Sequence, residues 1–382
     1  MNLNKVIQII TKLELGGAQA IVLDLCRKLL LENNEVVLIT NNEGVLVPDA
    51  KKIEKLKIYF LPELDRNINP LKDLKCLNKI KSIIKEEKPD IVHTHSSKAG
   101  ILGRFAARSN KIPVIVHTIH GFAFNKYQGY LIRNLFIVLE KYAANITNKL
   151  IAVSHDVMEK GLKENIGLPE QYKVIYNGVD VNLLQNINID RNKKIKTLGL
   201  DPDIPIIGMV ACLKPQKAPG DFIKMAAMIL GNHQKAQFIL IGDGVLREEV
   251  ETMIKNFKME KNVRLLGWRR DIPELLSIMD IFTLTSLWEG LPLTVLEAMA
   301  AGKPVVINNI DGNKDIVTDG EDGFLCEPKN IKQMAEKVVY LINDQKKAGS
   351  MGQKAIQYVQ KYDKNKMLEE NIMLYEELLI KT

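Results

Sequence analysis

Short runs of apolar and β-branched residues alternate along the chain with longer segments in which apolar residues recur at helical spacing. The runs in the first half are KVIQII, EVVLIT, DIVHTH, PVIVHTI and KLIAVS. After a polar, asparagine-rich stretch the pattern restarts with PIIGMVA, FILIGDG, VRLLGW, IFTLTS and PVVIN. This alternation predicts an α/β protein with two domains, each built on a parallel sheet flanked by helices.

The restart of the pattern divides the 382 residues into two Rossmann-like domains. We predict the first domain at 1–185, the second at 186–360, and a linker between them at about 182–196. A last helix at 361–382 is predicted to pack back on the first domain through one apolar face. That face carries Leu368, Ile372, Tyr375 and Leu379. Because ligands bind beyond the carboxyl ends of parallel strands, two such sheets facing each other are expected to form one deep cleft.

Composition indicates an ordinary globular protein, since 46% of the residues are hydrophobic, 26% are charged and no tract is of low complexity. The four cysteines have no spacing typical of a zinc site or a disulfide framework, which fits a reducing compartment. No apolar run is long enough to span a membrane, and the N-terminal run is too short for a signal peptide. We therefore expect a cytoplasmic protein. The net charge of +7 is spread along the chain and does not indicate a nucleic-acid partner.

The most basic stretch, Lys72–Lys88, has apolar residues at helical spacing and predicts an amphipathic helix. These apolar residues are Leu71, Leu74, Leu77, Ile80 and Ile84. The lysines fall on the opposite face, which favours an ordinary solvated helix over a contact with an anionic membrane surface.

Gly16 and Gly17 stand where the first predicted strand gives way to a helix. Without side chains there, a phosphate or a reacting group can approach the backbone amides at the positive helix end. A tight strand-to-helix turn explains the two glycines equally well. The pair is not the dinucleotide fingerprint, which needs a third spaced glycine and an acidic residue after the second strand. That strand ends instead in Thr40, Asn41 and Asn42, which argues against a redox enzyme.

Four of the six histidines lie at the ends of the predicted strands at 90–95 and 113–119. They are His93, His95, His117 and His120. We predict no metal site, because these strands offer no nearby cysteine and no HExxH helix to complete a ligand set. A neutral histidine beside a sugar can hydrogen-bond its hydroxyl groups, and His120, which a glycine follows, is the best candidate. His93 is better explained as a buried histidine satisfied by backbone groups.

Two lysines, Lys214 and Lys217, follow the apolar strand that opens the second domain. A departing nucleoside diphosphate develops negative charge, and fixed ammonium groups stabilise that transition state more than the ground state. A solvated lysine pair is the alternative interpretation. Gly242 and Gly244 follow the next strand, where they offer bare backbone to a ligand or form a common turn.

The segment WEGLPLTVLEAMAAG at 288–302 is expected to place a helix start at a strand end, with Pro292 in the first turn and Gly302 ending the helix. The amides expected to face a bound diphosphate are those of Gly290, Leu291, Leu293 and Thr294. Glu289 can accept from sugar hydroxyls and Glu297 from a ribose. Eight positions apart across a helix start, the two carboxylates cannot act as one close acid and base pair. The alternative is that they only favour a helix start and a solvated turn.

With seven residues between them, Glu289 and Glu297 resemble the signature of retaining glycosyltransferases of family 4. The resemblance covers nearly the whole chain in order, through LELGGAQ, TIHGFAF, LIAVS, IYNGVD, CLKPQK, IGDG and DGEDGFL. It implies the GT-B fold, in which two Rossmann-like domains face each other across a deep cleft, with no metal-binding DxD motif and no cofactor. The triplet Asp201-Pro202-Asp203 spells DxD and is interpreted as a turn.

Carried over to matching positions, the resemblance implies that Lys217 binds the diphosphate, Glu289 the donor sugar and Glu297 the ribose, with the donor nucleotide held mainly by the second domain. It also implies that His120 and Gly17 line the reaction point.

The family usually has an arginine five residues before the lysine. Cys212 stands there in this chain, and Lys214 is the candidate for the missing cation. Retention of anomeric configuration, implied by the resemblance, needs no protein nucleophile, because the leaving phosphate itself can take the proton of the acceptor hydroxyl.

The sequence therefore favours a metal-independent transferase that moves a sugar from a nucleotide diphosphate sugar, with UDP preferred, to an acceptor hydroxyl. A lipid-linked glycan or surface-polysaccharide precursor is the expected acceptor, with peripheral contact at the cytoplasmic face of the membrane. Two alternatives remain at this point. A nucleotide-sugar epimerase on the same fold would change the donor without an acceptor, and a noncatalytic subunit would bind the donor only.

Overall fold

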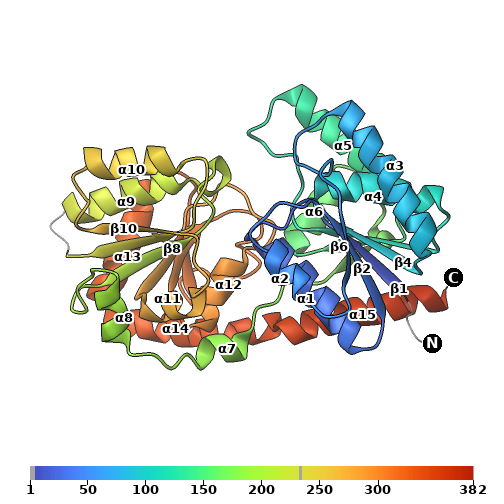
Figure 1. Cartoon of the computed structure of the whole chain (residues 1–382). Coiled ribbons are helices and arrows are strands. Elements are labelled where there is room, and N and C mark those ends of the chain that lie inside the picture. Colours follow the sequence, from blue (N-terminus) through green and yellow to red (C-terminus); the bar gives the residue numbers. More distant parts are fainter. Residues whose placement is uncertain (1–4, 232–234, 382) are drawn as a thin grey trace. The chain divides into compact units, whose positions relative to one another are not determined.

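The computed structural model describes residues 5–231 and 235–381, and these form two compact units (Figure 1). The first unit runs up to Asn177 and takes up the chain again from Asn365, and the second runs from Gly178 to Lys364. Each is built on one sheet whose described strands are all parallel, and most successive strands are connected through helices. The predicted α/β class with two parallel-sheet domains is confirmed.

The first unit holds a seven-stranded sheet of order β3-β2-β1-β4-β5-β6-β7. Its strands are β1 Lys5–Ile9, β2 Glu35–Thr40, β3 Lys57–Phe60, β4 Ile91–His95, β5 Val114–Ile119, β6 Lys149–Ala152 and β7 Tyr172–Val174. Its helices are α1 Gly17–Leu31, α2 Val47–Lys51, α3 Pro70–Glu87, α4 Ser97–Ser109, α5 Tyr130–Ala144, α6 His155–Lys163, the 3-10 turn η1 Pro169–Gln171, and α15 Lys364–Ile380. The order reverses between β1 and β4, which is where ligands bind in such sheets.

The second unit holds a six-stranded sheet of order β10-β9-β8-β11-β12-β13. Its strands are β8 Ile206–Val210, β9 Gln237–Ile241, β10 Val263–Gly267, β11 Ile281–Leu284, β12 Val305–Asn308 and β13 Gly323–Cys326. Its helices are α7 Val181–Gln185, α8 Arg191–Thr197, η2 Pro215–Lys217, α9 Pro219–Gly231, α10 Arg247–Asn256, α11 Ile272–Ile278, α12 Leu293–Ala300, α13 Ile331–Asn343, α14 Gln345–Val359 and η3 Gln360–Tyr362. The order reverses between β8 and β11, so the loops after these strands are placed to hold a ligand.

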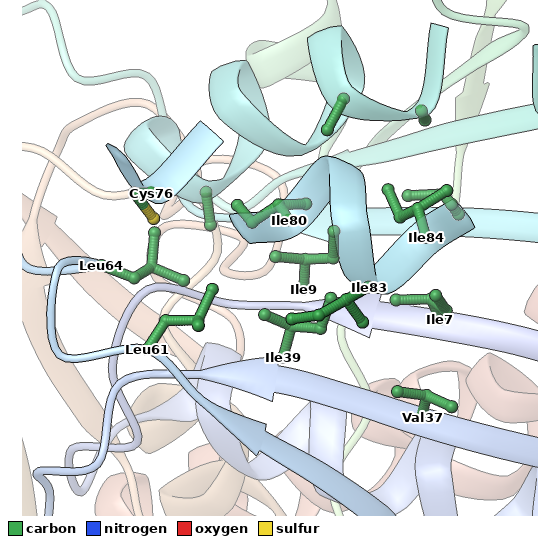
Figure 2. Close-up of a cluster of buried hydrophobic side chains, with 14 of the residues drawn as sticks. Ile7, Ile9, Val37, Ile39, Leu61, Leu64, Cys76, Ile80, Ile83 and Ile84 are labelled. Carbon is green, nitrogen blue, oxygen red and sulfur yellow. The ribbon is translucent and has the colours of Figure 1, made fainter. Parts of the chain in front are cut away.

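One face of the first sheet packs on α3 and α4, and Figure 2 shows this core. Ile7 and Ile9 of β1 and Ile39 of β2 meet Ile80 and Ile84 of α3, all buried. Because side chains alternate across a strand, the residue between the two isoleucines, Gln8, projects from the opposite face. That opposite face therefore receives polar side chains.

The predicted amphipathic helix is present as α3, but its buried face differs from the prediction. Ile80, Ile83 and Ile84 are buried, whereas Leu71 and Leu74 are exposed. Asn69 caps the helix by accepting a hydrogen bond from the amide of Lys72, and the first turn extends beyond the part that packs on the sheet. Helical spacing predicted that the apolar residues of α3 lie on one face. It did not predict which of them pack on the sheet.

The predicted linker at 182–196 is wrong, because α7 and α8 lie there as parts of the second unit. Asp180 and Asp190 cap these helices, and Ile195 is fully buried. The crossing between units lies earlier in the chain than predicted, because the backbone of Val179 pairs with the returning segment at Asp363. The return to the first unit begins after Lys364 and not at 361.

Within the described part of the chain, no helix is long and apolar enough to cross a bilayer.

Candidate functional site

In the second unit, the loop after β8 and the turn before α12 are joined by hydrogen bonds. The hydroxyl of Thr285 donates to the carbonyl oxygens of Lys217 (2.9 Å) and Ala218 (3.0 Å). The side-chain amide of Gln216 donates to the carbonyl oxygen of Trp288 at 2.7 Å. Ala218 has a φ of 45°, a left-handed conformation that turns the chain sharply into α9. These contacts fix two segments together that are far apart in the sequence.

The result of this arrangement is an ion pair between Lys217 and Glu289, which are 72 positions apart. The side chains are 17% and 8% exposed, so the pair is partly shielded from water and its charges interact more strongly than at an open surface. Gln216 also donates to the other oxygen of Glu289 at 3.4 Å. The structure thus brings together Lys217 and Glu289, the residues expected to bind the diphosphate and the donor sugar.

Helix α12 begins at Leu293, with Pro292 in an extended conformation as its N-cap, so the helix starts one residue later than predicted. Among the described residues, no acceptor is found for the amides of Leu293 and Thr294, as expected in a first helical turn. Gly302, with a φ of 69°, ends the helix as predicted, and its amide donates to Met299.

Gly312 is a residue of this site that the sequence did not single out. Its φ is 81°, and a Cβ there would lie 2.3 Å from the carbonyl oxygen of Gly290. The turn at Gly290 and Leu291 is therefore held by close backbone packing that only glycine permits at position 312. No spacing pattern in the sequence points to this contact, because the two positions lie in separate loops.

Glu297 lies on α12, and burial raises its pKa to about 7. Near neutral pH it is therefore present both as the acid and as the carboxylate, and it can donate to or accept from a hydroxyl group. The sequence predicted Glu297 as a ribose-binding group, and that role remains a prediction.

Gly242 and Gly244 do not offer free amides, contrary to the expectation from the sequence. The amide of Gly242 donates to Gly267 at 2.9 Å, and that of Gly244 donates to the side chain of Asp243 at 2.8 Å. Both have positive φ, and a Cβ on either would collide with the backbone of Ala211 or Leu213. These glycines hold the loop after β8 in place, and their assignment to donor binding remains a prediction.

Lys214 lies in the same loop, half-buried, with Cys212 two residues before it. The amide of Lys217 donates to the carbonyl oxygen of Lys214 at 2.9 Å, so the two lysines lie at the two ends of one tight turn. Its role as a substitute for the family's arginine stays a prediction. The interpretation of Asp201-Pro202-Asp203 as a turn is confirmed, since the amide of Asp203 donates to the side chain of Asp201.

In the first unit, α1 begins at Gly17 with Gly16 as an extended N-cap. The part of the chain that the structure describes provides no acceptor for the amides of Gly17, Ala18 and Gln19. This free helix end follows β1 at the point where the strand order reverses. It can receive an anionic or hydroxyl group, which is the role expected of the two glycines.

The four histidines divide between the two faces of the first sheet. His117 projects toward α4, where its ring would meet a Cβ on Gly100, and its Nδ1 donates to the carbonyl oxygen of Thr94 at 3.0 Å. His93, His95 and His120 share the other face, where Nδ1 of His95 lies 3.2 Å from Nε2 of His120. The expectation that His93 is satisfied by backbone groups is wrong, because its partners are the side chains of Tyr375 and Thr118.

Burial lowers the pKa of His120 to about 4 and that of His93 to about 3, and it holds the pKa of His95 and His117 well below 6.5. All four imidazoles are therefore neutral near pH 7 and act as hydrogen-bonding groups. Within residues 5–231 and 235–381, no cluster of three or more histidine, cysteine or acidic side chains is placed to hold a metal ion.

The two Rossmann-like units, with free amides after β1 and a lysine and glutamate pair beside α12, define a protein of the GT-B class. Residues 15–183 match Glycosyltransferase Family 4, and residues 190–358 match the glycosyl transferases group 1. The UDP-Gal:alpha-D-GlcNAc-diphosphoundecaprenol alpha-1,3-galactosyltransferase of Escherichia coli is 38% identical over 333 residues, covering 86% of each chain. The chain therefore belongs to the glycosyltransferases of the family 4 type.

Two further proteins resemble the chain over most of its length. The N,N'-diacetylbacillosaminyl-diphospho-undecaprenol alpha-1,3-N-acetylgalactosaminyltransferase of Campylobacter jejuni is 30% identical over 350 residues, covering 88% of this chain and 91% of that one. The crystal structure of Anabaena HepE in complex with UDP and glucose has a TM-score of 0.84 at 22% identity, covering 98% of this chain and all of that one. The structural likeness establishes the fold, and the sequence likeness establishes the family.

Proposed function

We propose that the protein transfers a sugar from a UDP-sugar to a hydroxyl group of a lipid-diphosphate-linked glycan, with retention of configuration and without a metal ion. The observation that carries the proposal is the ion pair of Lys217 with Glu289 beside the free amides of α12. The names of the two relatives, each acting on a sugar linked to diphosphoundecaprenol, support the acceptor class, and the first of them supports UDP.

The proposed reaction assigns the charges of the second unit as follows. The diphosphate of the donor accepts hydrogen bonds from the amides of Leu293 and Thr294 and approaches the ammonium group of Lys217. Glu289, already held by Gln216, accepts from a hydroxyl of the transferred sugar. As the bond between the sugar and the diphosphate breaks, negative charge grows on the phosphate and its attraction to Lys217 increases. The acceptor hydroxyl attacks from the same side and passes its proton to the leaving phosphate.

A donor and acceptor panel tests this assignment. We expect UDP-sugars to be consumed only when a lipid-diphosphate-linked sugar is added, with unchanged rate in excess EDTA and an α-linked product from an α-linked donor by proton NMR. Conversion of the donor without an acceptor would identify an epimerase. If the protein bound UDP-sugars but consumed none of them with any acceptor in the panel, it would be a noncatalytic subunit.

Helix α5 carries an apolar stripe that faces away from its own unit. Its residues recur at helical spacing and are between 47% and 82% exposed, and we call them the α5 surface: Leu131, Leu135, Val138 and Tyr142. Tyr130 and Ile132 extend it, also exposed. The opposite side of the helix is buried through Ile137 and Glu140. A contiguous exposed apolar stripe of this kind marks an interaction surface.

We propose that the α5 surface rests on an anionic lipid bilayer. The only acidic residue of α5, Glu140, is buried in an ion pair with Arg104, so the exposed face carries no carboxylate. Arg133 and Lys160 lie over the ring of Phe124 near the start of the helix, which places basic groups beside the apolar stripe, although Arg133 also pairs with Glu164. Apolar side chains flanked by cations suit the interface of an anionic membrane, where a polyprenol-linked acceptor is held.

Aspartates at Leu131 and Leu135 test the α5 surface. Burying a leucine in lipid contributes about 1.5–3 kcal/mol, so we expect the double variant to bind vesicles of phosphatidylglycerol and phosphatidylcholine at least about tenfold more weakly. Cosedimentation measures the binding. The matched control is Leu31→Asp on α1, where the leucine is 80% exposed and outside the stripe.

The same variants separate a lipid contact from a contact between two copies of the chain. Activity with a water-soluble acceptor analogue should be unchanged in the double variant. If light scattering showed a wild-type dimer that the double variant converts to a monomer, with equal vesicle binding by both, the stripe would be a dimer interface and the lipid proposal would be wrong.

A further inference from the structure

Polar side chains from three strands and the last helix form one buried hydrogen-bonded chain on the face of the first sheet opposite α3 and α4. Its members are Gln8 of β1, His93 and His95 of β4, Thr118 of β5, His120 after β5, and Tyr375 of α15. Strand register aligns them, because Gln8 stands opposite His93 and His95 stands opposite Thr118. Gln8, His93, His95 and Tyr375 are almost fully buried, so solvent does not decide the direction of these hydrogen bonds.

The direction of each bond on the side of His120 follows from the chemistry of the groups. The side-chain carbonyl oxygen of Gln8 lies 2.8 Å from Nε2 of His95 and can only accept, so Nε2 of His95 carries the hydrogen. Burial keeps His95 neutral, and its Nδ1 must therefore accept. The partner of that atom, at 3.2 Å, is Nε2 of His120, which must donate.

This chain leaves His120 with an unprotonated Nδ1. The atom is buried and has no hydrogen-bond partner among the residues that the structure describes. An unsatisfied buried acceptor costs about 1–3 kcal/mol, a cost that a ligand hydroxyl donating to it would remove. His120 follows β5 directly, at the carboxyl edge of the sheet, where ligands of such sheets bind.

The other end of the chain is also fully paired in this orientation of the Gln8 amide. The amide nitrogen of Gln8 donates to the hydroxyl oxygen of Tyr375 at 3.1 Å. Tyr375 donates its one hydrogen to Nδ1 of His93, and Nε2 of His93 then donates to the hydroxyl oxygen of Thr118 at 2.7 Å. The reverse orientation of the amide would reverse every bond in the chain and place a hydrogen on Nδ1 of His120. The hydrogen-bonded chain therefore couples the tautomer of His120 to the orientation of the Gln8 amide, which Tyr375 contacts.

We propose that Gln8 and Tyr375 are positioning residues that hold His120 in the tautomer whose Nδ1 accepts a hydrogen bond from a sugar hydroxyl. The identity of the ligand as a sugar rests on the proposed function. The tautomer of His120 is inferred from the hydrogen-bond directions alone. The proposal also gives helix α15 a function beyond packing, because the segment that returns to the first unit delivers Tyr375 to this network.

The tautomer can be measured directly by long-range proton–nitrogen NMR on the whole protein with nitrogen-labelled histidine, with His120→Gln used to assign the signal. In the wild type we expect His120 to carry its hydrogen on Nε2 and none on Nδ1. A hydrogen on Nδ1 would overturn the proposal, whatever the enzyme activity. This measurement needs no folded variant beyond the assignment and does not depend on knowing the substrate.

Tyr375→Phe tests the coupling. It removes the hydroxyl that orients Gln8, so we expect the His120 signal to shift toward the other tautomer and kcat to fall about tenfold, the effect of one misdirected hydrogen bond. The matched control is Thr118→Val, which also removes one hydroxyl partner from His93 but leaves Gln8 and Tyr375 joined. Thr118→Val should keep the wild-type His120 signal. Equal tautomer signals in the two variants would overturn the role of Tyr375. If Tyr375→Phe shifted the His120 signal but left kcat unchanged, the tautomer of His120 would depend on Tyr375 without contributing to sugar transfer.

Discussion

Replacing Lys217 by alanine should lower kcat about a hundredfold or more while leaving the second unit folded. The ammonium group lies in the ion pair with Glu289, beside the amides of α12, and in the proposed reaction its attraction to the diphosphate grows as the bond to the sugar breaks. An interaction that strengthens in the transition state affects kcat more than KM. Steady-state kinetics at saturating donor measures the change, and circular dichroism checks the fold.

Two further variants separate transition-state stabilisation from the loss of the ion pair. Lys217→Ala alone leaves Glu289 as an unpaired, mostly buried carboxylate, so the double variant with Glu289→Gln removes both charges and should remain as slow. Lys224→Ala serves as the control, because that lysine is exposed on α9 and its one ion pair within the described residues is with the neighbouring Asp221. Near-normal turnover of Lys217→Ala would remove this lysine from the mechanism.

The central strands could be predicted from the sequence because burial on both faces gives them continuous apolar runs. Three strands were missed, β3, β7 and β13, and all three lie at sheet edges with four residues or fewer. Strands this short hold at most three consecutive apolar residues, too few for periodicity to separate them from a loop. The short helices α7 and α8 were mistaken for a linker because only their caps and three buried apolar side chains, Val181, Leu184 and Ile195, stabilise them in an otherwise polar stretch.

The sequence predicted those site residues that stand in a recognisable local motif. It did not predict the contacts between residues that are distant in the sequence. Glu289 and Lys217 each stand in a recognisable loop, but only the fold shows that they pair. Gly312 and Gln8 were missed because their importance lies in contacts with remote segments. Gln8 did carry a signal, since a glutamine inside the apolar run KVIQII must find buried partners. Tyr375 was assigned to an apolar face, but its hydroxyl group is hydrogen-bonded to Gln8 and His93.

The largest expected loss of stability lies in the first unit, at the buried ion pair of Arg104 with Glu140. Their side chains are 0% and 5% exposed, and the guanidinium donates to Glu140 at 2.7 Å and to the carbonyl oxygen of Gly100 at 2.8 Å. Glu140→Ala would leave an uncompensated buried cation on α4, and removing one partner of such a pair costs about 3–5 kcal/mol. We expect urea denaturation of the full chain to show a loss of this size in the transition of the first unit.

Matched variants show whether this cost comes from the stranded charge or from lost packing. Glu377→Ala removes a carboxylate from an exposed pair with Lys381 in the same unit and should leave the urea transition almost unchanged. Arg104→Met combined with Glu140→Leu removes both charges and fills the space with apolar atoms, so it should recover most of the loss. If the double variant were as unstable as Glu140→Ala, the packing of α4 on α5 would be the cause and not the unpaired guanidinium. Glu140 is the acidic residue of α5, and the ion pair with Arg104 holds it on the buried side of the helix. The pair therefore also keeps negative charge away from the α5 surface.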